Sequence, residues 1–157
     1  MLKDLPLQHK IISDTVASFE KEEGVLAAVL VGSLSSGSGD ALSDADILII
    51  TTNHFHKKVD DCFAQFEAGK SIFHSFQHQE HQWAFKKYIF DDFTSAEIHC
   101  IDKGSDFRLS KPYKVLFDKT NIIPAKLTEA PPPKHEDFPA YQFGDEGLMW
   151  DLSLIHI

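Results

Sequence analysis

The first half of the chain alternates between apolar patterns typical of helices and of strands. Residues 8–23 and 54–68 carry apolar side chains at intervals of three and four, which predicts two helices with one buried face each. Between them, residues 26–31 and 46–51 are short and almost continuously apolar, as in strands buried within a core. The order helix, strand, strand, helix predicts an α/β domain.

The second half of the chain is richer in strand patterns. Residues 83–90 and 94–102 flank the turn Asp91-Asp92-Phe93, which predicts an antiparallel pair. Residues 111–118 predict a last short strand and turn. Together, the two halves predict an α/β (α+β) fold with a small mixed sheet and helices on one of its faces.

Candidate chemistry gathers where the first two strands meet. Gly32-Ser33 follows the first strand, and Asp44 and Asp46 open the second. Because side chains alternate along a strand, the two aspartates point the same way about 7 Å apart, where they repel by roughly 2 kcal/mol. A hard cation such as Mg²⁺ would turn that repulsion into a binding site. The glycine lets the backbone approach a phosphate, and the serine offers a hydroxyl and an N–H where a helix begins. The pattern predicts phosphoryl or nucleotidyl transfer.

Each half of this pattern is common by itself, Gly-Ser in loops and Asp-x-Asp in solvated turns or helix caps. Taken together, residues 31–48, VGSLSSGSGDALSDADIL, resemble the signature of the polymerase-β-type nucleotidyltransferase superfamily. Gly37 and Ser43 match the variant found in its small-molecule and minimal members. The resemblance implies two sets of site residues: nucleotide-binding Gly32, Ser33 and Ser43, and metal-binding Asp44 and Asp46.

A looser match extends the resemblance toward one branch of that superfamily. Residues 115–119, VLFDK, look like the segment that closes the catalytic domain of aminoglycoside and related antibiotic adenylyltransferases. The close resemblance covers about residues 26–51, and the looser one reaches about residue 120. It implies a Mg²⁺-dependent enzyme that moves AMP from ATP to a hydroxyl of a small molecule. An aminoglycoside-like antibiotic is the leading acceptor.

The superfamily uses a third acid from a neighbouring strand, and Glu97 matches that position. In 94–102, Glu97 lies on the face opposite Ala96 and Ile98, so it can point away from the core. Its implied role is metal ligand or general base. The alternative is a solvated glutamate of an edge strand. Asp102 competes for the role but falls on the opposite face, where it is interpreted as a turn residue.

Composition narrows the partners. The chain has 157 residues, with 15 Lys and Arg against 24 Asp and Glu, and a net charge of −9. This charge opposes non-specific binding of nucleic acid, but it suits a polycationic acceptor and leaves a metal-bound nucleoside triphosphate as co-substrate. Cys62 and Cys100 are isolated, and no signal peptide or membrane-spanning run is visible, so a cytoplasmic protein without a membrane partner is expected. The sequence leaves the oligomeric state open, a homodimer included.

Other side chains that could carry chemistry have ordinary interpretations. His74, His78 and His81 could suggest zinc, but no cysteine accompanies them, and a solvated polar segment is expected. Lys86 and Lys87 precede Glu97 in the chain, and one could reach a phosphate, although solvated edge lysines are commoner. The nearby aromatic residues are expected in the core rather than in a base-stacking platform, namely Trp83, Phe85 and Tyr88.

The chain is expected to divide into three parts. Residues 1–128 form the catalytic domain, and residues 129–151 hold a proline-rich linker and the start of a truncated helical domain that would shape the acceptor pocket. Residues 152–157, LSLIHI, equal a translation of the mosaic-end adapter of transposase-based sequencing libraries, which suggests an artefact. Two rival functions stay open: a minimal nucleotidyltransferase that adenylylates a partner protein, as in some toxin–antitoxin pairs, and a non-catalytic nucleotide-binding module.

Overall fold

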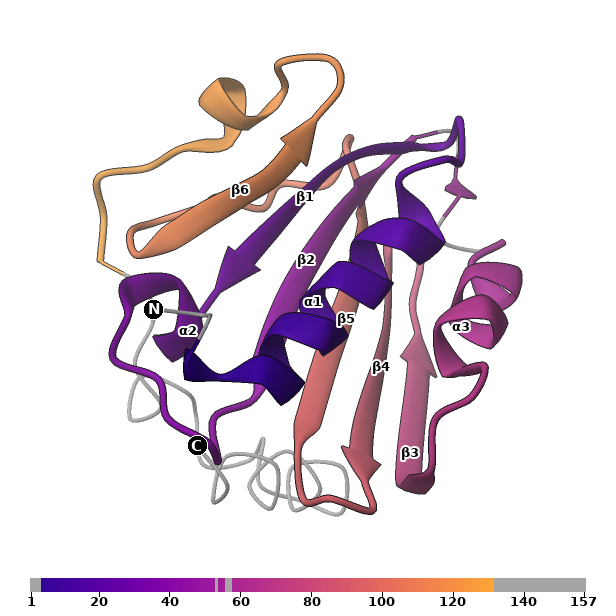
Figure 1. Ribbon diagram of the computed structural model, residues 1–157. Helices are drawn as coiled ribbons and strands as arrows, with labels where there is room; N and C mark the ends of the chain where they lie inside the picture. Colours follow the sequence, from indigo (N-terminus) through magenta and orange to yellow (C-terminus); the bar gives the residue numbers. More distant parts are fainter. Residues whose placement is uncertain (1–3, 53, 56–57, 132–157) are drawn as a thin grey trace, which may run out of the picture.

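Six strands in the order β3-β4-β5-β2-β1-β6 form the sheet on which the domain is built (Figure 1). The structure is a computed structural model, and it describes residues 4–52, 54–55 and 58–131. In chain order the elements are α1 (Pro6–Phe19), β1 (Val25–Val31), α2 (Ser33–Ser36), β2 (Ala45–Thr51), α3 (Asp60–Glu67), β3 (Ile72–Gln79), β4 (Trp83–Phe90), β5 (Ser95–Asp102), β6 (Tyr113–Asp118) and the 3₁₀ helix η3 (Ile123–Lys126).

The sheet is mixed, as the sequence predicts. β2 and β5 lie side by side and run parallel, whereas the other neighbouring pairs are antiparallel. A parallel pair needs a long crossover connection, and here it consists of α3 and the β3–β4 hairpin. The predicted α/β (α+β) fold with a small mixed sheet is therefore confirmed.

The main core lies between the sheet and the helices α1 and α3, which cover one face (Figure 1). Phe19 of α1 meets Phe63 of α3 edge to face, with their ring centroids 5.6 Å apart. Tyr88 of β4 is fully buried in this core, where its hydroxyl donates to Glu67 at 2.8 Å. The apolar stripes that predict the helices thus face the sheet.

The opposite face of the sheet holds a smaller core over β1 and β2. Val29 and Ile50 are fully buried there beneath Leu109 and Ile123, which come from the chain on either side of β6. Asp46 shares this face with Ile50, because the two residues are four apart in one strand. The Asp46 side chain therefore lies on the face away from α1 and α3.

One strand is absent from the sequence prediction. Residues 72–79, expected as a solvated polar segment, form β3, which pairs with β4 at one edge of the sheet. Its side chains are mostly exposed, with Phe73 75% accessible, so no buried face imposes a clear period on the sequence. The solvated character is right, but the missing strand changes the environment of β4, which becomes an interior strand.

The helix boundaries also differ from those predicted. α1 ends at Phe19 rather than residue 23, because residues 20–24 turn the chain back into β1. α3 begins at Asp60 rather than residue 54, since His54 has a φ of 59° and the Phe55 N–H donates to the Thr52 carbonyl in a turn.

The predicted linker and helical domain, together with residues 152–157, fall almost wholly in residues 132–157, outside the described part of the chain. Within the described residues, each helix is too short or too polar to span a bilayer.

Candidate active site

A single row of cross-strand partners runs across the sheet on the face away from the helices. From one edge to the other the row reads Tyr113, Val31, Asp46, Glu97, Lys87 and Phe76. Neighbouring strands lie about 4.8 Å apart, so two carboxylates and an ammonium group stand next to one another in the middle of the sheet.

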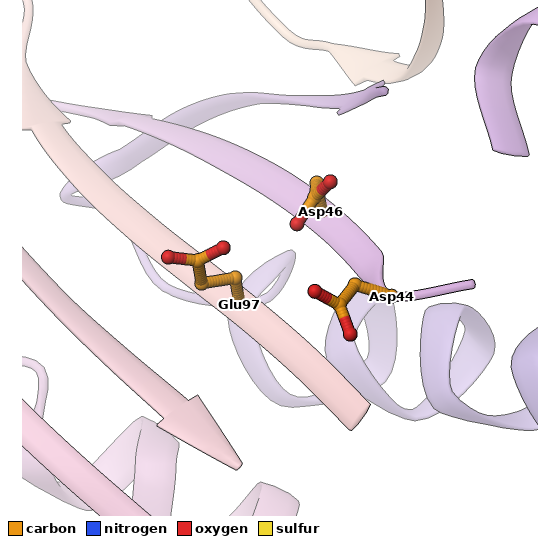
Figure 2. Close-up of side chains that lie close together, drawn as sticks. All are labelled: Asp44, Asp46 and Glu97. Carbon is orange, nitrogen blue, oxygen red and sulfur yellow. The ribbon is translucent and has the colours of Figure 1, made fainter. Parts of the chain in front are cut away.

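Three carboxylates converge at this point, as Figure 2 shows. Asp44 immediately precedes β2, Asp46 belongs to β2, and Glu97 projects from the parallel neighbour β5. Each offers an oxygen such that the three atoms lie within 4.8 Å of one another. Asp44 is 3% exposed and Glu97 is 8% exposed. The structure thus brings together the three acids to which the sequence analysis assigns the metal.

The closeness of these acids disfavours charge on all three at once. Burial raises the pKa of Asp46 from its ordinary 3.8 to about 8, assisted by the charges of Glu97 and Asp44, while Lys87 opposes the shift. Among the described residues, the Asp46 Oδ1 atom is buried without a hydrogen-bond partner. Such an atom is costly unless a donor or a cation satisfies it. The donor set fits a hard divalent cation such as Mg²⁺, because all three ligands are carboxylate oxygens.

Asp44 is held by Ser95, which the sequence analysis does not consider, and by Lys87, one of the two lysines that it considers for contact with a phosphate. The Ser95 hydroxyl donates to Asp44 Oδ1, and the Lys87 Nζ lies 3.5 Å from Asp44 Oδ2. The expectation that Lys87 is a solvated edge lysine is wrong, since its side chain is only 9% exposed. The physical reason is β3, which covers the outer edge of β4.

The sequence did contain a signal for Lys87. If the hairpin turns at Asp91-Asp92-Phe93, then two residues that lie the same number of positions before and after Asp92 are cross-strand partners. Lys87 and Glu97 both lie five residues from Asp92, and they are indeed paired in the ladder. Lysine and glutamate in facing positions attract, so the pair also favours this register.

Aromatic side chains flank Glu97 on its far side from Asp44. The Trp83 Nε1–H donates to His99 Nδ1 at 3.0 Å, which leaves the His99 Nε2 atom 3.8 Å from Glu97 Oε1. Burial lowers the pKa of His99, against the opposing charge of Glu97. The rings of Trp83, Phe85 and His99 stack on one another. Tyr88 in the helix-side core and Phe85 on the face of the carboxylates are both buried, as expected, whereas Trp83, on the same face as Phe85, is only half-buried.

Gly32 connects β1 to the site. Its φ is 76°, and a Cβ at this position would come within 2.6 Å of Asp46 Oδ2. Both observations require glycine, because other residues avoid this backbone conformation and the carboxylate occupies the space. The glycine predicted for its approach to phosphate is thus also needed for the position of Asp46.

The two serines assigned to nucleotide binding lie on either side of the loop after β1. Ser33 opens the single-turn helix α2, and Ser43 closes a turn in which its hydroxyl donates to Asp40 Oδ1 at 3.2 Å. Ser43 therefore has a structural role in shaping the approach to Asp44. The assignment of Gly32, Ser33 and Ser43 to nucleotide binding stays a prediction.

The remaining candidates lie away from the site. Asp102 accepts hydrogen bonds from the N–H groups of Gly104 at 2.9 Å and His54 at 3.1 Å, so it is a turn residue at the end of β5, as interpreted. Within the described residues, the metal-binding arrangement is that of the three carboxylates, and the histidines of β3 join none.

Comparison with known proteins identifies the family of this domain. A family model described as a nucleotidyltransferase domain matches residues 10–116, which include Gly32, the three acids and Lys87. The fold is also similar to the crystal structure of an aminoglycoside 6-adenyltransferase from Bacillus subtilis, at 13% identity and a TM-score of 0.42, over 60% of this chain and 35% of that chain. A structure of the GLD-2/RNP-8 complex is similar at 15% identity and a TM-score of 0.43, over 62% of this chain and 36% of that one.

The chain thus spans about a third of the length of these two structures' chains, at 35% and 36%. No curated protein sequence matches it. The family model covers residues 10–116 of 157, well over half of the chain. On this evidence the chain belongs to the nucleotidyltransferase domain family, within the polymerase-β-type nucleotidyltransferase superfamily.

Proposed function

We propose that this domain transfers AMP from ATP to a hydroxyl group of a small molecule in a Mg²⁺-dependent reaction. The observation that carries the proposal is the cluster of Asp44, Asp46 and Glu97, whose oxygens lie within 4.8 Å of one another directly beside Gly32. Membership of the nucleotidyltransferase family supports the same reaction class.

In the proposed site, Asp44, Asp46 and Glu97 hold the metal. Bound Mg²⁺ would neutralise the carboxylates and the charge that develops on the leaving pyrophosphate. Ser95 fixes the orientation of Asp44 through its hydroxyl, so that this carboxylate is positioned before any ligand arrives. Gly32 and Ser33 hold the triphosphate at the end of β1, and Ser43 adds to the same loop.

The chemical step is an in-line displacement at the α-phosphorus. The acceptor oxygen forms a bond to that phosphorus, the bond from the phosphorus to the bridging oxygen breaks, and pyrophosphate leaves with the electron pair. Glu97 is the base to which we assign the acceptor proton, because it is the partner of Asp46 on the neighbouring strand and offers an oxygen within 4.8 Å of both aspartates. The protein's part is otherwise positioning and electrostatic stabilisation.

An aminoglycoside-like antibiotic is the acceptor we propose. The net charge of −9 favours a polycationic ligand over nucleic acid, since an acidic surface attracts cations. The resemblance of residues 115–119 to the closing segment of antibiotic adenylyltransferases points the same way. We place the reaction in the cytoplasm, where both cysteines stay reduced.

The first test is nucleotide binding by calorimetry. The wild-type chain should bind MgATP, whereas Asp44→Asn and Asp46→Asn should each lose at least about tenfold in affinity, because they remove ligands of the metal. Asp91→Asn, which removes one exposed charge from the β4–β5 turn, is the matched control and should bind as the wild type does. If all four proteins bound MgATP equally, the metal assignment would be wrong.

The second test is transfer itself. ATP labelled at the α-phosphate is incubated with Mg²⁺ and a panel of aminoglycosides, and both pyrophosphate release and labelled antibiotic are measured. Label on an aminoglycoside supports the proposed acceptor. Label that appears on protein instead would favour a protein acceptor and overturn the small-molecule assignment.

A further inference from the structure

Lys87 stands beside the carboxylates, yet no part of the proposed reaction uses it. It belongs to β4, its side chain is 9% exposed, and its Nζ lies 3.5 Å from Asp44 Oδ2. Its partner in the strand ladder is Glu97. Burying an ammonium group destabilises the folded state unless the charge is paired. The position of Lys87 therefore needs an explanation beyond packing.

The charges in this cluster do not balance. Asp44, Asp46 and Glu97 can carry three negative charges, and Lys87 contributes one positive charge within the same buried region. A divalent cation bound to Asp44 would approach the same carboxylate that Lys87 contacts. Two cations that share one carboxylate repel each other, so the ammonium group and the metal compete for Asp44.

When a nucleoside triphosphate binds with the metal, the positive charge of Lys87 favours binding instead of opposing it. The triphosphate brings about four negative charges to the cluster, together with its metal, and any positive charge beside Asp44 then attracts the ligand. The ammonium group of a lysine is a compact charge on a flexible stem with three donors, so it can change partners by a short rotation.

We propose that Lys87 is a positioning residue with two alternating partners. Without ligand it pairs with Asp44, and once a metal ion binds Asp44 together with the triphosphate, Lys87 contacts the phosphates instead. The inference rests on the proposed function and deepens it. Its consequence is that Lys87 opposes binding of metal alone and favours binding of metal with nucleotide. A residue with a purely structural role would affect both in the same direction.

The chain supplies a matched control in the next residue. Lys86 points to the opposite face of β4, where its Nζ pairs with Glu67 of α3. Its side chain is 15% exposed, so it resembles Lys87 in burial and in having an acidic partner. Lys86→Met and Lys87→Met therefore remove the same charge from the same strand, on different faces.

Two binding measurements test the proposal. Mn²⁺ alone is titrated and followed by electron paramagnetic resonance, and the unreactive α,β-methylene analogue of ATP with Mg²⁺ is titrated by calorimetry. In Lys87→Met, the affinity for Mn²⁺ should rise by about fivefold or more, while the affinity for the analogue should fall by about tenfold or more, since the lost charge repels metal and attracts phosphate. Lys86→Met should change neither by more than about twofold, because its charge lies on the far face.

The opposite results would overturn the inference. If Lys87→Met weakened both ligands, or left both unchanged, Lys87 would have no alternating role. Lys87→Gln is the second neutral variant if the methionine protein lacks cooperative unfolding, and Lys87→Arg should keep affinity for the analogue within about threefold of the wild type. Failure of the wild type itself to bind the analogue would count against the proposed function, whereas normal wild-type binding with an unaffected Lys87→Met would count against this inference alone.

Discussion

The charge cluster predicts that Asp46→Asn makes the metal-free protein more stable. Asparagine keeps the shape of the side chain and removes one of three charges whose oxygens lie within 4.8 Å. At that distance and an effective dielectric constant of 20, each like-charge pair costs about 3.5 kcal/mol. Lys87 offsets part of this repulsion, and protonation of Asp46 relieves more of it. We therefore expect a gain of about 1–3 kcal/mol near pH 8, or several degrees in Tm for a chain of this size.

The same variant has a definite pH dependence. The pKa of Asp46 in the folded protein is about 8, above its ordinary value of 3.8, so the folded state holds a proton that the unfolded state has released. The contribution of this group to stability is full below pH 3.8 and is lost as the pH rises toward 8. Wild type should therefore lose stability across this range relative to Asp46→Asn, and the difference between the two should be larger at pH 8 than at pH 5.

Thermal unfolding followed by circular dichroism, with and without Mg²⁺, is the assay. A ligand present at a hundred times its Kd stabilises a protein by about 2.7 kcal/mol, so wild type should gain from Mg²⁺ at pH 8 while Asp46→Asn gains little. Asp91→Asn should behave as wild type does in every condition, because its side chain is exposed in a turn. The reasoning is refuted if Asp46→Asn is less stable than wild type without metal, or if both gain equally from Mg²⁺.

Three further predictions concern single residues. Gly32→Ala should lower the free energy of unfolding by about 1–3 kcal/mol and abolish stabilisation by Mg²⁺, since alanine is strained at a φ of 76° and its Cβ would meet Asp46 Oδ2. Urea unfolding at several Mg²⁺ concentrations measures both effects, and normal stabilisation by Mg²⁺ would contradict the prediction. Ser95→Ala should cost about 1–3 kcal/mol in the same assay, because it takes a donor from the buried Asp44 carboxylate. Burial raises the pKa of the Cys62 thiol to about 11. Ellman's reagent at pH 8 should therefore label Cys62 no faster than the protein unfolds locally and exposes the thiol. Rapid labelling under native conditions would contradict this.

The parts of the site that could be predicted from the sequence are those fixed by local geometry. Asp44 and Asp46 lie two residues apart at the start of β2, so the alternation of side chains along a strand was enough to place them on one face. Gly32 directly follows β1, the strand that pairs with β2. Glu97 is distant in the chain, but its strand pattern also gave its face correctly. The ladder then sets it opposite Asp46, a partnership that no pattern within residues 94–102 could specify.

The burial of Lys87 could not be predicted because the sequence pattern does not reveal β3. An edge strand whose side chains are mostly exposed on both faces has no hydrophobic period, and here it is rich in histidine and glutamine. Without it, β4 looks like the edge of the sheet and Lys87 like a solvated residue. The register of the hairpin would still have paired Lys87 with Glu97. Local charge pairing across a predicted turn was therefore more informative than the expected exposure of lysine.

The crossover between β2 and β5 explains why these features occur together. Parallel neighbours cannot be joined by a tight turn, so the chain must leave the sheet after β2 and return before β5. Parallel alignment is also what sets Asp46 and Glu97 side by side near the start of their strands. The last part of the crossover is β4, which lies next to β5 and carries Lys87 into the row. The same connection that brings the third acid to the other two therefore brings the positive charge that makes their closeness tolerable in the absence of metal.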